Sequence, residues 1–228
     1  GILASGDVII SGSMAGDIAA TATSDLYAFG IYSGGAISIG SIASTGSVTA
    51  IAGTSRAYGL DGVTGVTIVG EMAGSISATA TSGFGAYGID SDGAVSIGAI
   101  ASTGSITATA GTNGAYGLRG TTGVTIAGGM AGTITATAGG HTALGIWSGG
   151  TLNGGSAATP LSISGTVSAQ AAGLAVGVAA NGAMNLYVTG TLSGTDTTGG
   201  GQGYAIGAGI ADGAGGWATG GGVNTVRV

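Results

Sequence analysis

Residues 65–90 read GVTIVGEMAGSISATATSGFGAYGID, and the rest of the chain repeats variants of this stretch. The stretch closes with an alanine, an aromatic or other large apolar residue, a glycine and an aliphatic residue. This signature begins at Ala28, Ala57, Ala86, Ala115 and Ala143, and returns in weaker form at Ala175 and Ala205. The first five copies are separated by steps of 29, 29, 29 and 28 residues. The sequence therefore contains about seven copies of one motif.

A repeat of this length along a chain of 228 residues indicates one solenoid domain. Within each copy, apolar and polar residues alternate with period two, which is typical of a half-buried strand. Three such runs fit each copy, at residues 66–69, 76–80 and 86–90. We predict an all-β, single-domain parallel β-helix (a right-handed β-solenoid) of about seven coils of ~29 residues, with three strands per coil.

The two ends of the chain depart from the regular repeat. We assign residues 1–207 to β-helix repeats and residues 208–228 to a Gly-rich tail with a possible terminal strand at 223–228. Residues 148–159, before the single proline, are predicted to protrude as a loop. Glycine-containing pairs separate the strand runs, and we expect them to supply the positive φ angles that tight corners need.

Equivalent residues of successive coils should form columns. An aliphatic interior column is predicted at Ile18, Val48, Ile76, Ile106, Ile134 and Val167, and an alanine column lies two residues further along each coil. An aromatic column comprises Phe29, Tyr58, Tyr87 and Tyr116. Aliphatic residues replace it in later coils, so we predict that these rings stack inside the core.

Two further columns occupy the alternate strand positions that are predicted to point outward. The first is a Thr ladder, which consists of Thr21, Thr49, Thr79, Thr107, Thr109, Thr135 and Thr137. Ile51 and Gln170 interrupt it. The second is a surface column, which consists of Tyr32, Asp61, Asp90, Arg119 and Trp147. Asp61 and Asp90 should lie about 5 Å apart, which is the separation of a retaining glycosidase pair. The alternative is a surface ion pair between Asp90 and Arg119.

The composition argues against several classes of function. Only 5% of the residues are charged, with three Arg and no Lys, so we expect no nucleic-acid partner. No run of about 18 apolar residues exists, so we expect no membrane span. One histidine, His141, and no cysteine make zinc binding or a catalytic triad unsupported. Residues 90–93, Asp-Ser-Asp-Gly, match half of a calcium loop but lack its further acids. We expect no cofactor, no metal and no catalytic residues.

The strings GSISATAT (74–81), GSITATAG (104–111) and AYGI (86–89) resemble repeats in the β-helical passenger regions of bacterial autotransporters and related large surface adhesins. The similarity covers about residues 1–207. It implies an exported stalk that is extracellular or on the bacterial cell surface. The translocator barrel and the recognisable cap of that family are missing from this sequence.

The leading functional hypothesis is a noncatalytic extracellular structural protein: a surface stalk, an adhesin segment or a fibre subunit. Residues 1–6 match the close of a coil, so we expect either sequence before them or end-to-end stacking of subunits. The expected partners are other copies of the chain or cell-surface polysaccharides. One alternative is binding of ice or a polysaccharide through the Thr ladder. Another is polysaccharide cleavage by Asp61 and Asp90.

Overall fold

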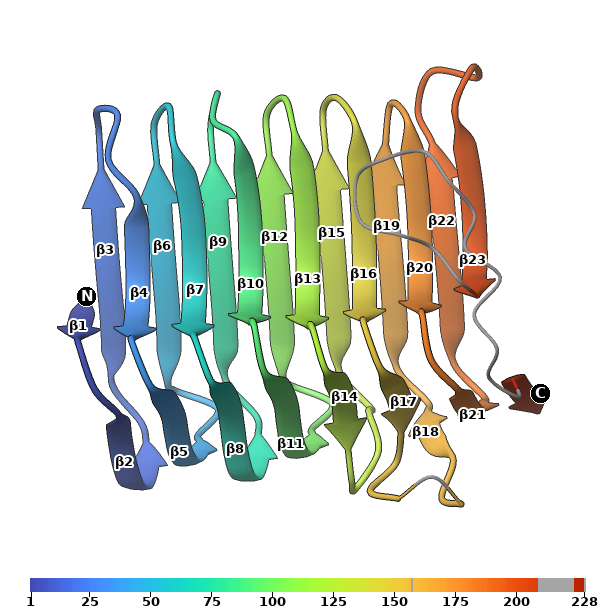
Figure 1. The fold of residues 1–228 in the computed structure, drawn as a ribbon, viewed down its shortest axis with the longest axis horizontal. Helices are drawn as coiled ribbons and strands as arrows, with labels where there is room; N and C mark the ends of the chain where they lie inside the picture. Colours follow the sequence, from blue (N-terminus) through green and yellow to red (C-terminus); the bar gives the residue numbers. More distant parts are fainter. Residues whose placement is uncertain (157, 209–223, 228) are drawn as a thin grey trace.

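A computed structural model describes residues 1–156, 158–208 and 224–227, and these form a parallel β-solenoid (Figure 1). The described residues form 24 strands and no helix, in three parallel sheets that run the length of the molecule. The predicted fold class, with about seven coils and three strands per coil, is confirmed.

The strands of sheets A and C follow one another in chain order, coil by coil, whereas in sheet B strand β21 lies between β17 and β18 and also pairs with β24. Sheet A contains β1 (Ile2–Ala4), β4 (Ala28–Ser33), β7 (Arg56–Gly62), β10 (Gly85–Ser91), β13 (Gly114–Gly120), β16 (Thr142–Ser148), β20 (Leu174–Ala180) and β23 (Gln202–Ala208). Sheet B contains β2 (Val8–Met14), β5 (Ala36–Ile42), β8 (Gly65–Met72), β11 (Ala94–Ile100), β14 (Gly123–Ile126), β17 (Thr151–Asn153), β18 (Leu161–Ile163), β21 (Met184–Val188) and β24 (Asn224–Arg227). Sheet C contains β3 (Asp17–Ala22), β6 (Ser47–Ala52), β9 (Ser75–Ala80), β12 (Ser105–Ala110), β15 (Thr133–Ala138), β19 (Thr166–Ala171) and β22 (Thr191–Asp196).

Equivalent residues of successive coils are direct neighbours. In sheet C, Ile76 pairs with Ile106 and Ile106 with Ile134, and the register continues through all seven strands without a shift. Sheet B shifts register near its corner, for example between Ile97 and Ala99. The coil length therefore sets the pairing along the sheets, and the register shifts lie in the second half of the sheet B strands.

The interior contains two kinds of packing. Aliphatic side chains of all three sheets form the main core, and Ile89, Ile97 and Ile106 are each fully buried within it. A second cluster consists only of alanines from sheets A and C, including Ala86 and Ala108. Because alanine is small, the two sheets approach closely there. The predicted alanine column therefore lies at a narrow edge of the interior.

The glycine of the closing signature allows this close approach. A Cβ atom on Gly88 would collide with Cγ2 of Ile106 in sheet C and with the carbonyl oxygen of Gly117 in the next coil. The alternation of inward and outward side chains also shifts by one position at this residue. Ala86 points inward to the alanine cluster, and after Gly88 the inward residues are Ile89 and Ser91.

The predicted role of glycine in the corners was wrong in most coils. Among the described residues, only Gly129, Gly155 and Gly199 have positive φ angles. Most corner glycines are instead required by contact between coils. At Gly93, for example, a Cβ atom would collide with the backbone of Thr64 in the preceding coil.

Part of the predicted loop forms a strand. Residues 151–153 of the expected loop form β17 in sheet B, and residues 154–156 and 158–160 follow it without strand structure. The predicted terminal strand exists as β24, which pairs with β21. The rest of the predicted Gly-rich tail, residues 209–223 and 228, lies outside the described residues.

We predict that Gly88→Ala lowers the free energy of unfolding by about 1–3 kcal/mol, because the added methyl overpacks the contact with Ile106. Guanidinium unfolding followed by circular dichroism measures the change. Gly12→Ala is the matched control, since no atom lies within 4 Å of its added Cβ. Equal stability of the two variants would contradict the close-approach explanation.

Candidate functional site

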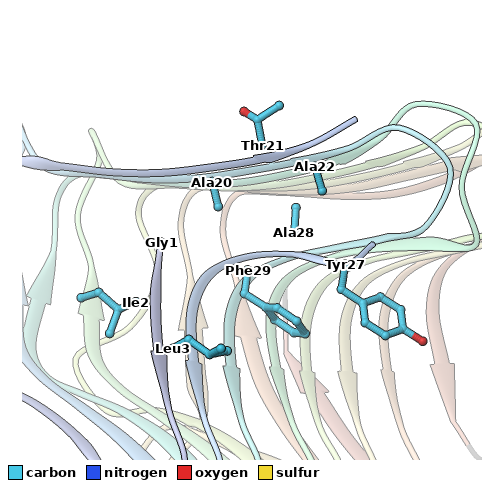
Figure 2. A pocket seen from close by; sticks show the side chains of 9 residues that line it. All are labelled: Gly1, Ile2, Leu3, Ala20, Thr21, Ala22, Tyr27, Ala28 and Phe29. Carbon is cyan, nitrogen blue, oxygen red and sulfur yellow. The ribbon is translucent and has the colours of Figure 1, made fainter. Parts of the chain in front are cut away.

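The outer face of sheet A brings together two columns that the sequence treated separately. The aromatic column was predicted to stack inside the core. The rings do stack, and Tyr58 and Tyr116 are buried, but the column lies on the outer face of sheet A and not in the main aliphatic core. Because the parity changes at the signature glycine, the aromatic residue and the residue three positions later both point outward. Figure 2 shows the ring of Phe29 directed away from sheet C, whereas Ala28 points toward Ala22 of that sheet. Figure 2 also shows the residues that line a shallow pocket at the first coil.

The rings form a continuous aromatic stack along the outer face. Neighbouring ring centroids lie 5.1 Å (Phe29 and Tyr58), 4.8 Å (Tyr58 and Tyr87) and 5.1 Å (Tyr87 and Tyr116) apart, with interplanar angles of 14°, 8° and 1°. These values describe offset stacking, which stabilises aromatic pairs. Tyr58 and Tyr116 are each only 8% exposed, since their neighbours cover the ring faces.

The surface column runs beside the aromatic stack. The pairing places Tyr32 next to Asp61, Asp61 next to Asp90, Asp90 next to Arg119, and Arg119 next to Trp147. The ring of Tyr32 lies 5.0 Å from that of Phe29. All five predicted residues of this column therefore lie together against the stack.

The sequence interpretation missed Tyr27. Its ring lies 5.9 Å from that of Phe29 and 6.4 Å from that of Tyr58, in edge-to-face geometry. The signal was present, since Tyr27 precedes Ala28 and has the same parity as Phe29 in a regular strand. Arg56 occupies the corresponding position in the next coil, so no column of tyrosines revealed it.

Arg119 is the electrostatic centre of this face. Its Nη1 atom donates to both carboxylate oxygens of Asp90, at 3.0 and 3.2 Å. Its guanidinium carbon lies 5.9 Å from the ring centroids of Tyr87 and Tyr116 and 5.5 Å from that of Trp147. These are cation–π distances. The alternative of an ion pair between Asp90 and Arg119 is the geometry that the structure shows.

The neighbouring acids have raised pKa values. Burial and the charges of Asp90 and Asp92 together raise the pKa of Asp61 to about 7, although Arg119 opposes the shift. Burial also raises the pKa of Asp90, although the ion pair with Arg119 lowers it in part. A carboxylic acid with a raised pKa beside a second carboxylate is the electrostatic pattern of an acid–base pair.

The geometry around these acids is poor for glycan cleavage. Both oxygens of Asp90 are occupied by Arg119, and the residue is only 6% exposed. The faces of the flanking rings stack on one another, so little ring surface is free to hold a sugar. Within the part of the chain that the structure describes, no group of three or more His, Cys, Asp or Glu residues is placed to hold a metal.

The Thr ladder lies on the outer face of sheet C. Thr49, Ser77, Thr107 and Thr135 pair in sequence, and so do Thr79, Thr109 and Thr137. Thr21 pairs with Ile51, which interrupts the second column as the sequence predicted.

His141 is exposed in a corner. The described residues include no helix with the length and hydropathy of a transmembrane segment.

Comparison of the chain with protein-family models, with curated proteins and with solved structures finds no match. The β-solenoid is established by the structure itself. The relationship to autotransporter passenger regions and adhesins stays a prediction.

We predict that stability falls between about pH 4 and pH 7. An unfolded Asp has a pKa of about 3.9, whereas folded Asp61 holds its proton until about pH 7, so the native state binds more protons in this window. The loss of unfolding free energy should be about 2 kcal/mol, after allowance for partial exposure.

Denaturant unfolding at a series of pH values tests this prediction. Asp61→Asn should flatten the profile and stabilise the protein at neutral pH. Glu71→Gln is the control, because Glu71 is exposed and lies on sheet B. A flat profile for the unsubstituted protein would contradict the assignment.

We predict that Arg119→Met lowers the free energy of unfolding by about 2–3 kcal/mol, because it leaves the buried Asp90 carboxylate unpaired. Adding Asp90→Asn should recover part of that loss, and a double-mutant cycle measures the coupling. Arg56→Met is the control, since Arg56 is exposed. Strictly additive effects of the two substitutions would show that the pair contributes nothing.

Proposed function

We propose that this chain is a noncatalytic structural protein of the extracellular surface, in which the solenoid acts as a stiff stalk or adhesin segment. The observation that supports this proposal is the unbroken register of sheet C through all seven of its strands. Force along the axis is then shared by parallel backbone hydrogen bonds between every pair of coils.

The interior and the composition also favour a durable rod. The main core extends through every coil, from Val8 in β2 to Val188 in β21. Trypsin sites are scarce, since Lys is absent and the chain has three Arg. Arg119 is held in a strand by an ion pair. A protein exposed to proteases outside the cell gains from these features.

The proposed partners are cell-surface components or further copies of the chain. End-to-end stacking stays a prediction, which electron microscopy of the native particle tests. Seven coils at about 4.8 Å give a rise of roughly 34 Å per subunit in such a filament. Glycan cleavage is less well supported because the carboxylate of Asp90 is occupied and buried.

We predict that pulling the chain by its two ends unravels it in discrete steps. Each coil of about 29 residues should release roughly 100 Å of chain, because extended residues span about 3.5 Å each. Single-molecule force spectroscopy measures these steps. Extension without resolvable steps would contradict a mechanical role for the solenoid.

The proposed extracellular location and the proposed lack of catalytic activity are tested separately. An antibody against the chain should label intact cells of the source organism, and labelling only after permeabilisation would contradict an extracellular role. Sugar release from any polysaccharide, if it is abolished by Asp61→Asn or Asp90→Asn, would contradict a noncatalytic role.

A further inference from the structure

The outer face of sheet C contains a regular patch of hydroxyl side chains. Strands β9, β12 and β15 each present three outward Ser or Thr residues, and the residues of the three strands pair in register. We call this set the hydroxyl patch: Ser75, Ser77, Thr79, Ser105, Thr107, Thr109, Thr133, Thr135 and Thr137. Its first column was not recognised in the sequence, and it widens the Thr ladder from two columns to three.

Among the residues that the structure describes, the hydroxyl groups at the centre of the patch have no protein partner. No hydrogen bond within the described residues joins the hydroxyl groups of Thr79, Thr107 or Thr109 to another protein atom. Corner hydroxyls behave differently, since those of Ser91 and Thr103 donate to backbone carbonyls of the preceding coil. The hydroxyl groups of Thr79, Thr107 and Thr109 are therefore available as donors and acceptors to an external partner.

The patch is also ordered and periodic in two directions. Its columns repeat about every 4.8 Å along the axis and about every 6.7 Å along each strand. Threonine has restricted χ1 rotamers, and the central threonines are half-buried between their neighbours, so the hydroxyl positions are pre-arranged. Figure 1 shows β9, β12 and β15 side by side with their axes nearly parallel.

We propose that the hydroxyl patch binds the surface of ice. An array that repeats in two directions is complementary to a lattice with similar repeats, and the hydroxyl and methyl groups of threonine suit a lattice of water. Sheet C carries charge only at Asp17 and Asp196, in its first and last strands, which disfavours a mineral surface. None of its strands contains an aromatic residue, which disfavours stacking on a crystalline polysaccharide.

Nanolitre osmometry of the purified full chain tests this proposal. The protein should lower the freezing point of water below its melting point, and we call this difference the freezing gap. It should also facet growing ice crystals. Thr107→Tyr places a bulky ring at the centre of the patch and should abolish most of this freezing gap. Thr67→Tyr is the matched control, because Thr67 is a half-buried outward threonine at the centre of a strand of sheet B. It should keep the full gap.

A second variant separates hydroxyl loss from misfolding. Thr79→Val with Thr109→Val keeps the side-chain shape, so circular dichroism should be unchanged while the freezing gap shrinks. The proposal is overturned by an unmodified protein that neither depresses freezing nor facets ice, or by equal losses in the two Tyr variants. Unchanged activity of the Val variant, or binding to crystalline cellulose with no effect on ice, overturns it as well.

Discussion

In-register parallel pairing between successive coils is the constraint on which the rest of the structure depends. Each residue has its own counterpart from the next coil as its nearest neighbour, about 4.8 Å away. Apolar columns and aromatic stacks gain from this arrangement, whereas columns of like charge repel. The low charge of the chain follows from the same constraint. Asp61 and Asp90 are neighbours in successive coils, and there the pKa of an aspartate rises to about 7.

The signature glycine sets which columns reach the surface. At Gly88 and its counterparts, sheets A and C approach so closely that no Cβ atom fits. The strand changes its inward parity there, so both the aromatic residue and the residue three positions later point outward. Sheet C has no such change, and its strands alternate regularly from end to end.

The two outer faces consequently differ in chemistry. On sheet A, the rings cover one another, and the guanidinium of Arg119 is shared between Asp90 and three aromatic rings. Its polar and aromatic groups are largely satisfied within the protein, which suits a stabilising role. On sheet C, the hydroxyl groups of Thr79, Thr107 and Thr109 have no hydrogen-bond partner within the described part of the chain. Recognition of an external surface is therefore better placed on sheet C.

The sequence by itself determined the coil length, the three strands per coil and the members of each column, because periodicity and alternation are properties of the chain. It also placed Asp90 beside Arg119, since residues one repeat apart become neighbours. Only the tertiary structure decided that the rings of Phe29 and Tyr58 lie outside. That outcome depends on how closely a second sheet approaches the signature glycine. Burial likewise decided the raised pKa of Asp61, because desolvation depends on the side chains that surround a group in space.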